Sequence, residues 1–292
     1  MAAVDYKDSL ADQIHADFEA GRLDSALARA REAVNKYPQS SEFQQLLGVA
    51  LFKKGLNQDA LMAFRHAIEL DPRIPQNYFD LALVYLAVHH YPEASKSLEA
   101  CLRLDPKNAE AHLLLGRAYH NQNQTLPAIE QFRKALDLNS TLPLAHYHLG
   151  FAYQSLGNLG SALGEYNREI KVNPTFAEAY WLAGNTDLKF GNLDSAEKLY
   201  RQAIRLKPQA YQAHYGLARV FMARRDFPQA ETELSAALRA EPGDTEIHYA
   251  LARLYQQTGR KDAADHEFAV CAELHAQEQR KGAGIAGAAP QP

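Results

Sequence analysis

Apolar side chains recur along this chain in helix-length segments that are separated by short polar turns. One pair of such segments is "AEAHLLLGRAYHN" (109–121) and "PAIEQFRKALDL" (127–138). In both segments apolar residues recur at i, i+3, i+4 and i+7, the spacing that places them on one face of an α-helix. The pattern predicts a helical hairpin here, and similar pairs of segments follow one another along the chain.

The predicted hairpins repeat every 34 residues. Alanine recurs at 26, 60, 94, 128, 162, 196, 230 and 264, and proline ends the unit at 38, 72, 106, 174, 208 and 242. A fixed period of about 20–50 residues indicates a stacked array, in which each unit buries its apolar face against its neighbours. We therefore predict one array over residues 7–278, with the repeats 7–40, 41–74, 75–108, 109–142, 143–176, 177–210, 211–244 and 245–278.

Small residues occupy the tightest places of each predicted hairpin. Five turns carry glycine, at 21, 55, 157, 191 and 259, where glycine permits a positive φ after a helix. The recurring alanine is expected where the two helices cross, because axes about 8–10 Å apart leave room for only a small side chain. Larger residues are expected to fill the space beside it: Phe64, Leu98, Phe132, Tyr166, Tyr200, Leu234 and Phe268.

Together these features resemble the tetratricopeptide repeat (TPR) family, with its pattern of L-G-x-x-Y, then A-x-x-x-F-x-x-A, then proline. "LLGRAY" (114–119) and "LGFAY" (149–153) match the first part of the pattern. The resemblance implies an all-α fold, a right-handed superhelical α-solenoid of helix-turn-helix hairpins. It leaves residues 1–6 as an N-terminal leader and 279–292 as a Gly/Ala/Pro tail that is predicted to be disordered.

Three repeats depart from the family pattern. Asp17 and Asp187 stand at the position that the family gives to an aromatic residue, and Ser140 replaces the closing proline of its repeat. The first repeat also has Gln13 and Ile14 where apolar and small residues are usual. We interpret this repeat as an N-terminal cap.

Charge and residue usage exclude several classes of function. Lys and Arg number 31 against 35 Asp and Glu, so the net charge is near −4, without the basic excess typical of nucleic-acid binding. The sequence contains no run of 18 apolar residues, so no membrane-spanning helix is predicted. No cofactor is predicted, and motifs such as HExxH, GxSxG and GxxxxGK[ST] are absent from the sequence, so we do not predict an enzyme.

Cysteine and histidine are interpreted as packing residues. Cys101 and Cys271 lie five periods apart, which places ten helices between them in an intact array and excludes a disulfide. Four histidines share the fourth position of their repeats, where a flat ring packed between helices explains all of them: His112, His146, His214 and His248. A metal site is therefore not predicted.

The first helix of each repeat carries apolar and aromatic side chains beyond the face that a core requires. Positions 5 and 9 of the repeat lie roughly 120° from the core positions on a helical wheel. The candidate binding residues at these positions are Phe79, Leu83, Leu113, Arg117, Tyr147, Phe151, Trp181, Asn185, Tyr215, Arg219, Tyr249 and Arg253.

Two interpretations of these residues stay open. A first helix with neighbours on both sides can be buried nearly all round, in which case the residues are core. The family resemblance implies instead that first helices line a concave groove, where aromatic and arginine side chains bind a peptide. The specific peptide sites of two TPR subfamilies are missing, because position 5 never carries the lysine of a carboxylate clamp and only Asn185 remains of an asparagine ladder.

The sequence thus predicts a non-enzymatic protein–protein interaction module that binds a peptide segment of a partner protein in its concave groove. The alternative is a scaffold that self-associates as a homo-oligomer by stacking through its terminal repeats. The last helix favours this alternative, because it carries Ala269, Val270 and Ala272 on the side where a ninth repeat would dock. Binding of single-stranded RNA by the aromatic and arginine residues is disfavoured by the acidic net charge.

Overall fold

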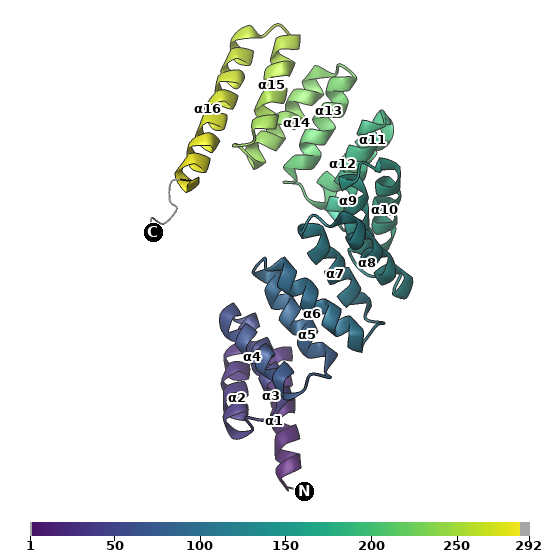
Figure 1. The fold of residues 1–292 in the computed structure, drawn as a ribbon. Helices are drawn as coiled ribbons and strands as arrows, with labels where there is room; N and C mark the ends of the chain where they lie inside the picture. Colours follow the sequence, from purple (N-terminus) through teal and green to yellow (C-terminus); the bar gives the residue numbers. More distant parts are fainter. Residues whose placement is uncertain (1, 287–292) are drawn as a thin grey trace. The chain divides into compact units, whose positions relative to one another are not determined.

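A computed structural model describes residues 2–286, and the side chains of residues 9–277, 279 and 280. The described residues form sixteen α-helices and no strand (Figure 1), so the predicted all-α fold is confirmed. The chain divides into two compact units, Met1–Leu156 and Gly157–Pro292. The boundary falls within the predicted repeat 143–176, and a single array that continues across it stays a prediction.

In the N-terminal unit the helices alternate between first and second members of hairpins. The first helices are α1 (Ala2–Glu19), α3 (Ser41–Lys53), α5 (Pro75–Ala87), α7 (Ala109–Asn121) and α9 (Ala145–Ser155). The second helices are α2 (Leu23–Lys36), α4 (Asn57–Leu70), α6 (Tyr91–Leu104) and α8 (Thr125–Leu138). Helix α1 begins at Ala2, within the segment that the sequence predicts to be a leader.

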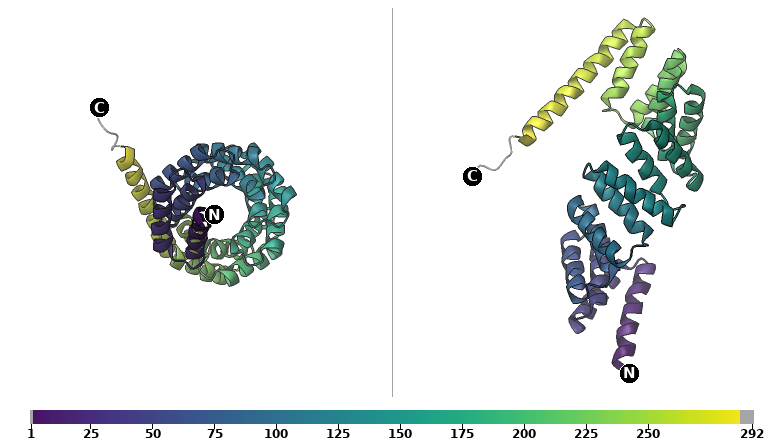
Figure 2. Two further views of the ribbon diagram at one scale, coloured as in Figure 1. Left: turned by 90° about the horizontal axis from the view of Figure 1, so that it is seen from below. Right: turned by 45° about the vertical axis from the view of Figure 1, so that its right-hand side comes forward.

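The C-terminal unit continues the alternation. It begins with the second helix α10 (Leu159–Val172), followed by the first helices α11 (Ala177–Lys189), α13 (Tyr211–Ala223) and α15 (Thr245–Gln257). Between and after them come the second helices α12 (Leu193–Leu206), α14 (Phe227–Ala240) and α16 (Lys261–Ala286). Helix α16 runs on past the end of α15 (Figure 2), so residues 279–286 are helical although the sequence predicts disorder there. Residues 287–292 of the predicted tail lie outside the described residues.

The hairpins are held together by complementary side-chain sizes. The recurring alanine is fully buried in seven repeats, and Ala264 of the last is 3% exposed. Within a hairpin, a large residue on one helix meets a small one on the other. A methyl group added to Gly48 would lie 2.6 Å from the Phe64 ring, and one added to Gly116 would lie 2.5 Å from Phe132.

In other repeats the two facing side chains fill a similar volume with different residue types. Ala82 faces the smaller Leu98 in the third repeat, and the first repeat reverses the order with Ile14 and Ala30, both fully buried. Ile14, which departs from the family pattern, is thus compensated by its partner. Native packing density leaves no room for both members of a pair to be large.

Every hairpin turn contains one residue with a positive φ. The five predicted glycines have φ between 68° and 79°, so the predicted turn conformation is confirmed. The other three repeats place His89, Asn123 and Arg225 at the equivalent position with φ near 60°. A non-glycine residue is strained in this conformation by about 1–2 kcal/mol, because Cβ crowds the following carbonyl.

We expect Arg225→Gly to raise the free energy of unfolding by about 0.5 kcal/mol, because glycine removes the strain at φ 60° and loses part of the gain to chain entropy. The measurement is urea denaturation followed by circular dichroism. Gly191→Ala is the matched control, since it introduces the same strain at an equivalent turn and should lower stability. A glycine variant at 225 no more stable than the parent would contradict this explanation.

Candidate functional site

First helices lie closer together than second helices in both units. Helix α11 contacts α13, and α1, α3 and α5 contact one another in turn, as do α7 and α9. Within a unit, each second helix that lies between two first helices packs against both of them, as α12 does against α11 and α13. The helices of each unit therefore form two layers, visible in the end-on view of Figure 2. We call the side of the first-helix layer that faces away from the second helices the first-helix surface.

In the C-terminal unit this surface carries six of the predicted binding residues. Trp181 and Tyr215 are half-buried against the core, whereas Tyr249 is 49% exposed. One helical turn after each ring stands Asn185, Arg219 or Arg253. The Arg219 guanidinium lies 5.8 Å from the centre of the Tyr215 ring, and Arg253 Nη1 donates to the Tyr249 hydroxyl over 3.4 Å. Rings and hydrogen-bond donors therefore alternate along three consecutive first helices.

Tyr200 of α12 holds Asn185 in place. Its hydroxyl donates to Asn185 Oδ1 over 2.6 Å, which fixes the oxygen side of the amide. Burial raises the pKa of Tyr200, and nearby Arg219 opposes the rise, so the phenol stays a hydrogen-bond donor. The amide of Asn185 therefore has a defined orientation on the surface.

In the N-terminal unit the predicted residues divide between core and surface. Phe79 and Leu113 are only 8% and 7% exposed and belong to hydrophobic clusters, so they offer little area to a ligand. Arg117 is exposed, and Phe151 is 38% exposed. Leu83 and Tyr147 are half-buried, with the Tyr147 ring 6.5 Å from that of Phe151.

Two histidines behind Arg117 are held neutral. Burial, together with Arg117 and His120, lowers the pKa of His148 to about 3, and its ring stacks on Phe132 with centroids 5.8 Å apart. Burial also lowers the pKa of His120. His120 Nδ1 is buried without a hydrogen-bond partner, and the ring meets the edge of Phe151 at 5.3 Å. Of these three side chains, Arg117 is therefore the one that carries a positive charge at neutral pH.

The histidines at repeat position 4 act as hydrogen-bonded clamps, which the sequence analysis missed. In three repeats one ring nitrogen faces a carbonyl of the preceding turn and the other faces a side chain of the second helix. The carbonyls are those of Pro106, Pro208 and Pro242 at 3.2, 3.0 and 3.0 Å, and the side chains are Gln131, Glu233 and Glu267 at 2.8, 2.6 and 2.6 Å from His112, His214 and His248. Since both partners of His214 are acceptors, only the protonated ring of His214 can donate to both.

We expect His214 to stabilise the C-terminal unit at acidic pH. The hydrogen bond with Glu233 raises the pKa of His214, with a smaller contribution from the Pro208 carbonyl and opposition from burial. Its stabilisation is complete below the unfolded pKa of about 6.5 and is lost as the pH rises through the higher folded pKa. Melting temperatures between pH 6 and 8.5 should therefore fall more for the parent than for Glu233→Gln, which copies the neutral pairing of His112 with Gln131. Equal slopes would contradict the clamp.

The two aspartates that replace an aromatic residue form equivalent hydrogen bonds. Asp17 is 2% exposed and accepts from Arg22 Nε over 2.8 Å. Asp187 is 6% exposed and accepts from Asn192 Nδ2 over 3.1 Å and from Ser195 Oγ over 2.5 Å. Arg22 and Asn192 occupy the same turn position in "GRLDSA" and "GNLDSA". The aspartates therefore tie the turn to the first helix, and each has a structural partner.

In the part of the chain that the structure describes, neither a metal site nor a reactive thiol is indicated. No three His, Cys, Asp or Glu side chains there could hold a metal ion together. Cys101 is a buried free thiol whose pKa burial raises to about 11, and Cys271 donates to the Thr245 carbonyl over 3.6 Å. No helix in residues 2–286 is both long and apolar enough to span a bilayer.

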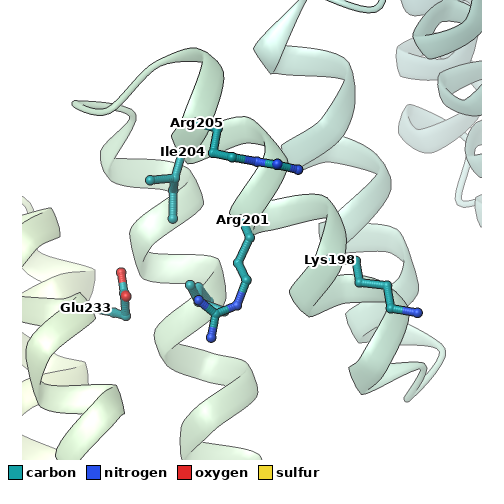
Figure 3. A pocket seen from close by; sticks show the side chains of 6 residues that line it. Lys198, Arg201, Ile204, Arg205 and Glu233 are labelled. Atoms are coloured by element: carbon teal, nitrogen blue, oxygen red, sulfur yellow. The ribbon is translucent and has the colours of Figure 1, made fainter.

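Hollows of about 310–520 Å³ lie on the opposite side, between consecutive second helices. One lies between α12 and α14 above α13 (Figure 3), and others lie between α4 and α6 and between α6 and α8. Their lining residues do not include the predicted binding residues. The molecule thus has two distinct surfaces with recurring features.

Comparison with known families and structures agrees with this architecture. Models described as tetratricopeptide repeat match residues 12–74, 147–210, 187–241 and 245–275, and one described as TPR repeat matches 90–123 and 116–157. No curated protein sequence matches the chain. Among solved structures, MamA is 28% identical with a TM-score of 0.53, over 56% of this chain and 95% of that chain.

Two further structures share the fold. YrrB, described as a TPR protein with an unusual peptide-binding site, is 23% identical with a TM-score of 0.54, over 63% of this chain and 95% of that chain. PilF of Pseudomonas aeruginosa is 19% identical with a TM-score of 0.66, over 77% of this chain and 100% of that chain. The family models cover most of the chain, and the helical hairpins, positive-φ turns and buried alanines follow the same repeat. The chain belongs to the tetratricopeptide repeat family and has its all-α solenoid fold.

Proposed function

We propose that the first-helix surface of the C-terminal unit binds a peptide segment of a partner protein. Membership of the TPR family supports a protein–protein interaction module. The observation that carries the finer proposal is the repeated pairing of an accessible ring with a donor one turn further on, at Trp181, Tyr215 and Tyr249. Aromatic and arginine side chains supply most of the binding energy at protein interfaces.

The charges on this surface indicate the chemistry of the peptide. Arg219 and Arg253 are exposed and suit carboxylates, either of acidic side chains or of a C-terminus. The rings suit apolar or aromatic side chains between those carboxylates. Arg117 and Phe151 offer the same combination on the N-terminal unit. YrrB supports the proposal only through its fold, because its identity to this chain is 23%.

We expect Trp181→Ala to weaken peptide binding by at least about tenfold, or ~1.4 kcal/mol, because truncation removes the largest ring of the surface. Peptides are first selected from a displayed random library against the parent protein, and their affinities are then measured by fluorescence anisotropy. Leu126→Ala is the matched control, since Leu126 is 69% exposed on the second helix α8. Selected peptides that bind the Trp181 variant as tightly as the parent would exclude this surface.

Self-association through α16 is a second proposal. Ala269 and Ala272 are exposed on this helix and Val270 is half-buried, whereas the equivalent sides of α12 and α14 are covered by the next first helix. If α16 mediates stacking, the mass by light scattering should rise with concentration and fall to that of a monomer in Val270→Glu. A monomeric mass at all concentrations would remove this proposal.

A further inference from the structure

The hollow between α12 and α14 differs in charge from the chain as a whole. It measures about 520 Å³ and lies over α13. Its lining residues are Lys198, Arg201, Ile204, Arg205, Leu217 and Glu233. Leu217 is buried and Ile204 half-buried, so the floor is apolar while the rim carries three cations and one carboxylate. Figure 3 shows Arg201 and Ile204 on one helix, with Glu233 on the other side of the hollow.

The three cations stand at repeat positions where α4, α6 and α8 each include a carboxylate. Lys198, Arg201 and Arg205 occupy positions 22, 25 and 29 of their repeat. In α4 these positions hold Met62, Arg65 and Glu69; in α8 they hold Glu130, Arg133 and Asp137. Since the chain has a net charge of −4, this cluster of positive charge is a local feature and does not reflect the average composition.

Arg201 differs from Arg65 and Arg133 in that no hydrogen bond occupies its terminal nitrogens. Arg65 donates to the Tyr85 hydroxyl over 2.6 Å, and Arg133 does the same with Tyr153 at 2.5 and 3.1 Å. Arg201 instead lies 5.8 Å from the ring centre of Phe221, which has no hydroxyl. Its Nε donates to Glu197 over 2.8 Å, and Phe221 leaves both terminal nitrogens available to a ligand.

We propose that this hollow is a docking site for an acidic peptide segment with one apolar side chain between carboxylates. The apolar side chain would cover Ile204 and Leu217, and the carboxylates would pair with Arg201 and Arg205, whose guanidinium forks suit this geometry. Glu233 is engaged with His214 Nδ1 at 2.6 Å and opposes a continuous polyanion. The apolar floor and Glu233 therefore favour a peptide over a nucleic acid. This site is on the opposite side from the first-helix surface and does not depend on the proposed function.

The test uses the full chain and a fluorescein-labelled peptide of glutamate and serine around a single central leucine. We expect Arg201→Gln/Arg205→Gln to weaken binding by about tenfold, since two charged hydrogen-bonding partners are lost. Arg65→Gln is the matched control, because Arg65 occupies the same repeat position beside Glu69, and it should change the affinity less than about twofold. Trp181→Ala should leave this affinity unchanged, which separates the two surfaces.

Changes to the peptide, and an RNA of equal charge, test which kind of ligand occupies the hollow. Replacing the central leucine of the peptide by serine should weaken binding, and replacing its glutamates by glutamine should abolish the salt dependence. The proposal is overturned if Arg65→Gln loses as much affinity as the double variant or if the serine peptide binds equally well. It is also overturned if an RNA oligonucleotide of equal charge binds more tightly at the same residues. Dissociation of a parent oligomer by the double variant would assign the hollow to a second copy of the chain instead.

Discussion

Gly48→Ala is expected to destabilise the N-terminal unit by about 2 kcal/mol, although alanine is the better helix former by about 1 kcal/mol. The added methyl group would lie 2.6 Å from Cε1 of Phe64, well inside van der Waals contact. The Phe64 ring is 1% exposed and has little room to move. Overpacking of this kind in a dense core typically costs about 1–3 kcal/mol.

The second substitution Phe64→Leu should restore most of the loss. The double variant copies the Ala82 and Leu98 pair of the third repeat, so its stability should lie within about 1 kcal/mol of the parent. Urea denaturation followed by circular dichroism, with hydrogen exchange of the α3 and α4 amides, measures both effects. Since the residues touch, their effects should be non-additive. Additive losses would contradict the account of hairpin packing by matched sizes.

Acidification is expected to destabilise the N-terminal unit through His148. The folded pKa is about 3, chiefly because of burial, whereas an unfolded histidine titrates near 6.5. The unfolded chain therefore takes up the proton first. The stabilisation is complete above about pH 6.5 and is lost at about 1.4 kcal/mol per pH unit as the pH falls towards 3. Between pH 6.5 and 5 this loss amounts to about 2 kcal/mol.

His148→Leu should remove this pH dependence. Leucine occupies the equivalent position at Leu46 and Leu114, so the repeat accommodates it. Denaturation midpoints of parent and variant, measured from pH 7 to 5, should diverge as the pH falls, with the smaller loss in the variant. Protonation of His214 stabilises the folded state at higher pH values, whereas protonation pressure on His148 destabilises it at lower ones. The contributions of the two histidines to stability can therefore be measured separately. Parallel curves for parent and variant would contradict a buried neutral His148.

The fold followed from the sequence because each repeat restates the same steric rules. Ala128 had to be small at a helix crossing, and Gly191 had to permit a positive φ, so eight copies of one pattern reinforced each other. Single departures were harder to interpret. His89 and Arg225 adopt the glycine conformation at a cost that surrounding packing outweighs, and Asp17 is buried because Arg22 supplies its hydrogen bond.

The candidate site was less predictable, because exposure depends on neighbours that periodicity does not specify. Phe79 and Trp181 share a repeat position, yet Phe79 is buried in a core cluster while Trp181 is half-buried. The clamp of His214 and Glu233 depends on a separation of 19 residues between two helices. The same separation recurs in the pairs of His112 with Gln131 and of His248 with Glu267. It indicates a contact only when the geometry of the hairpin is known. The arginine and aromatic pairs 20 residues apart, such as Arg133 and Tyr153, follow the same logic.

The fluorescence of Trp181 tests the central claim most directly, because this is the single tryptophan of the chain. The measurement is its emission spectrum, and its quenching by acrylamide, as a peptide selected against the parent protein is added. We predict partial quenching of the free protein, followed by a blue shift and protection that saturate at the affinity measured by anisotropy. Saturating peptide that leaves both the emission and the quenching of Trp181 unchanged would contradict binding at the first-helix surface.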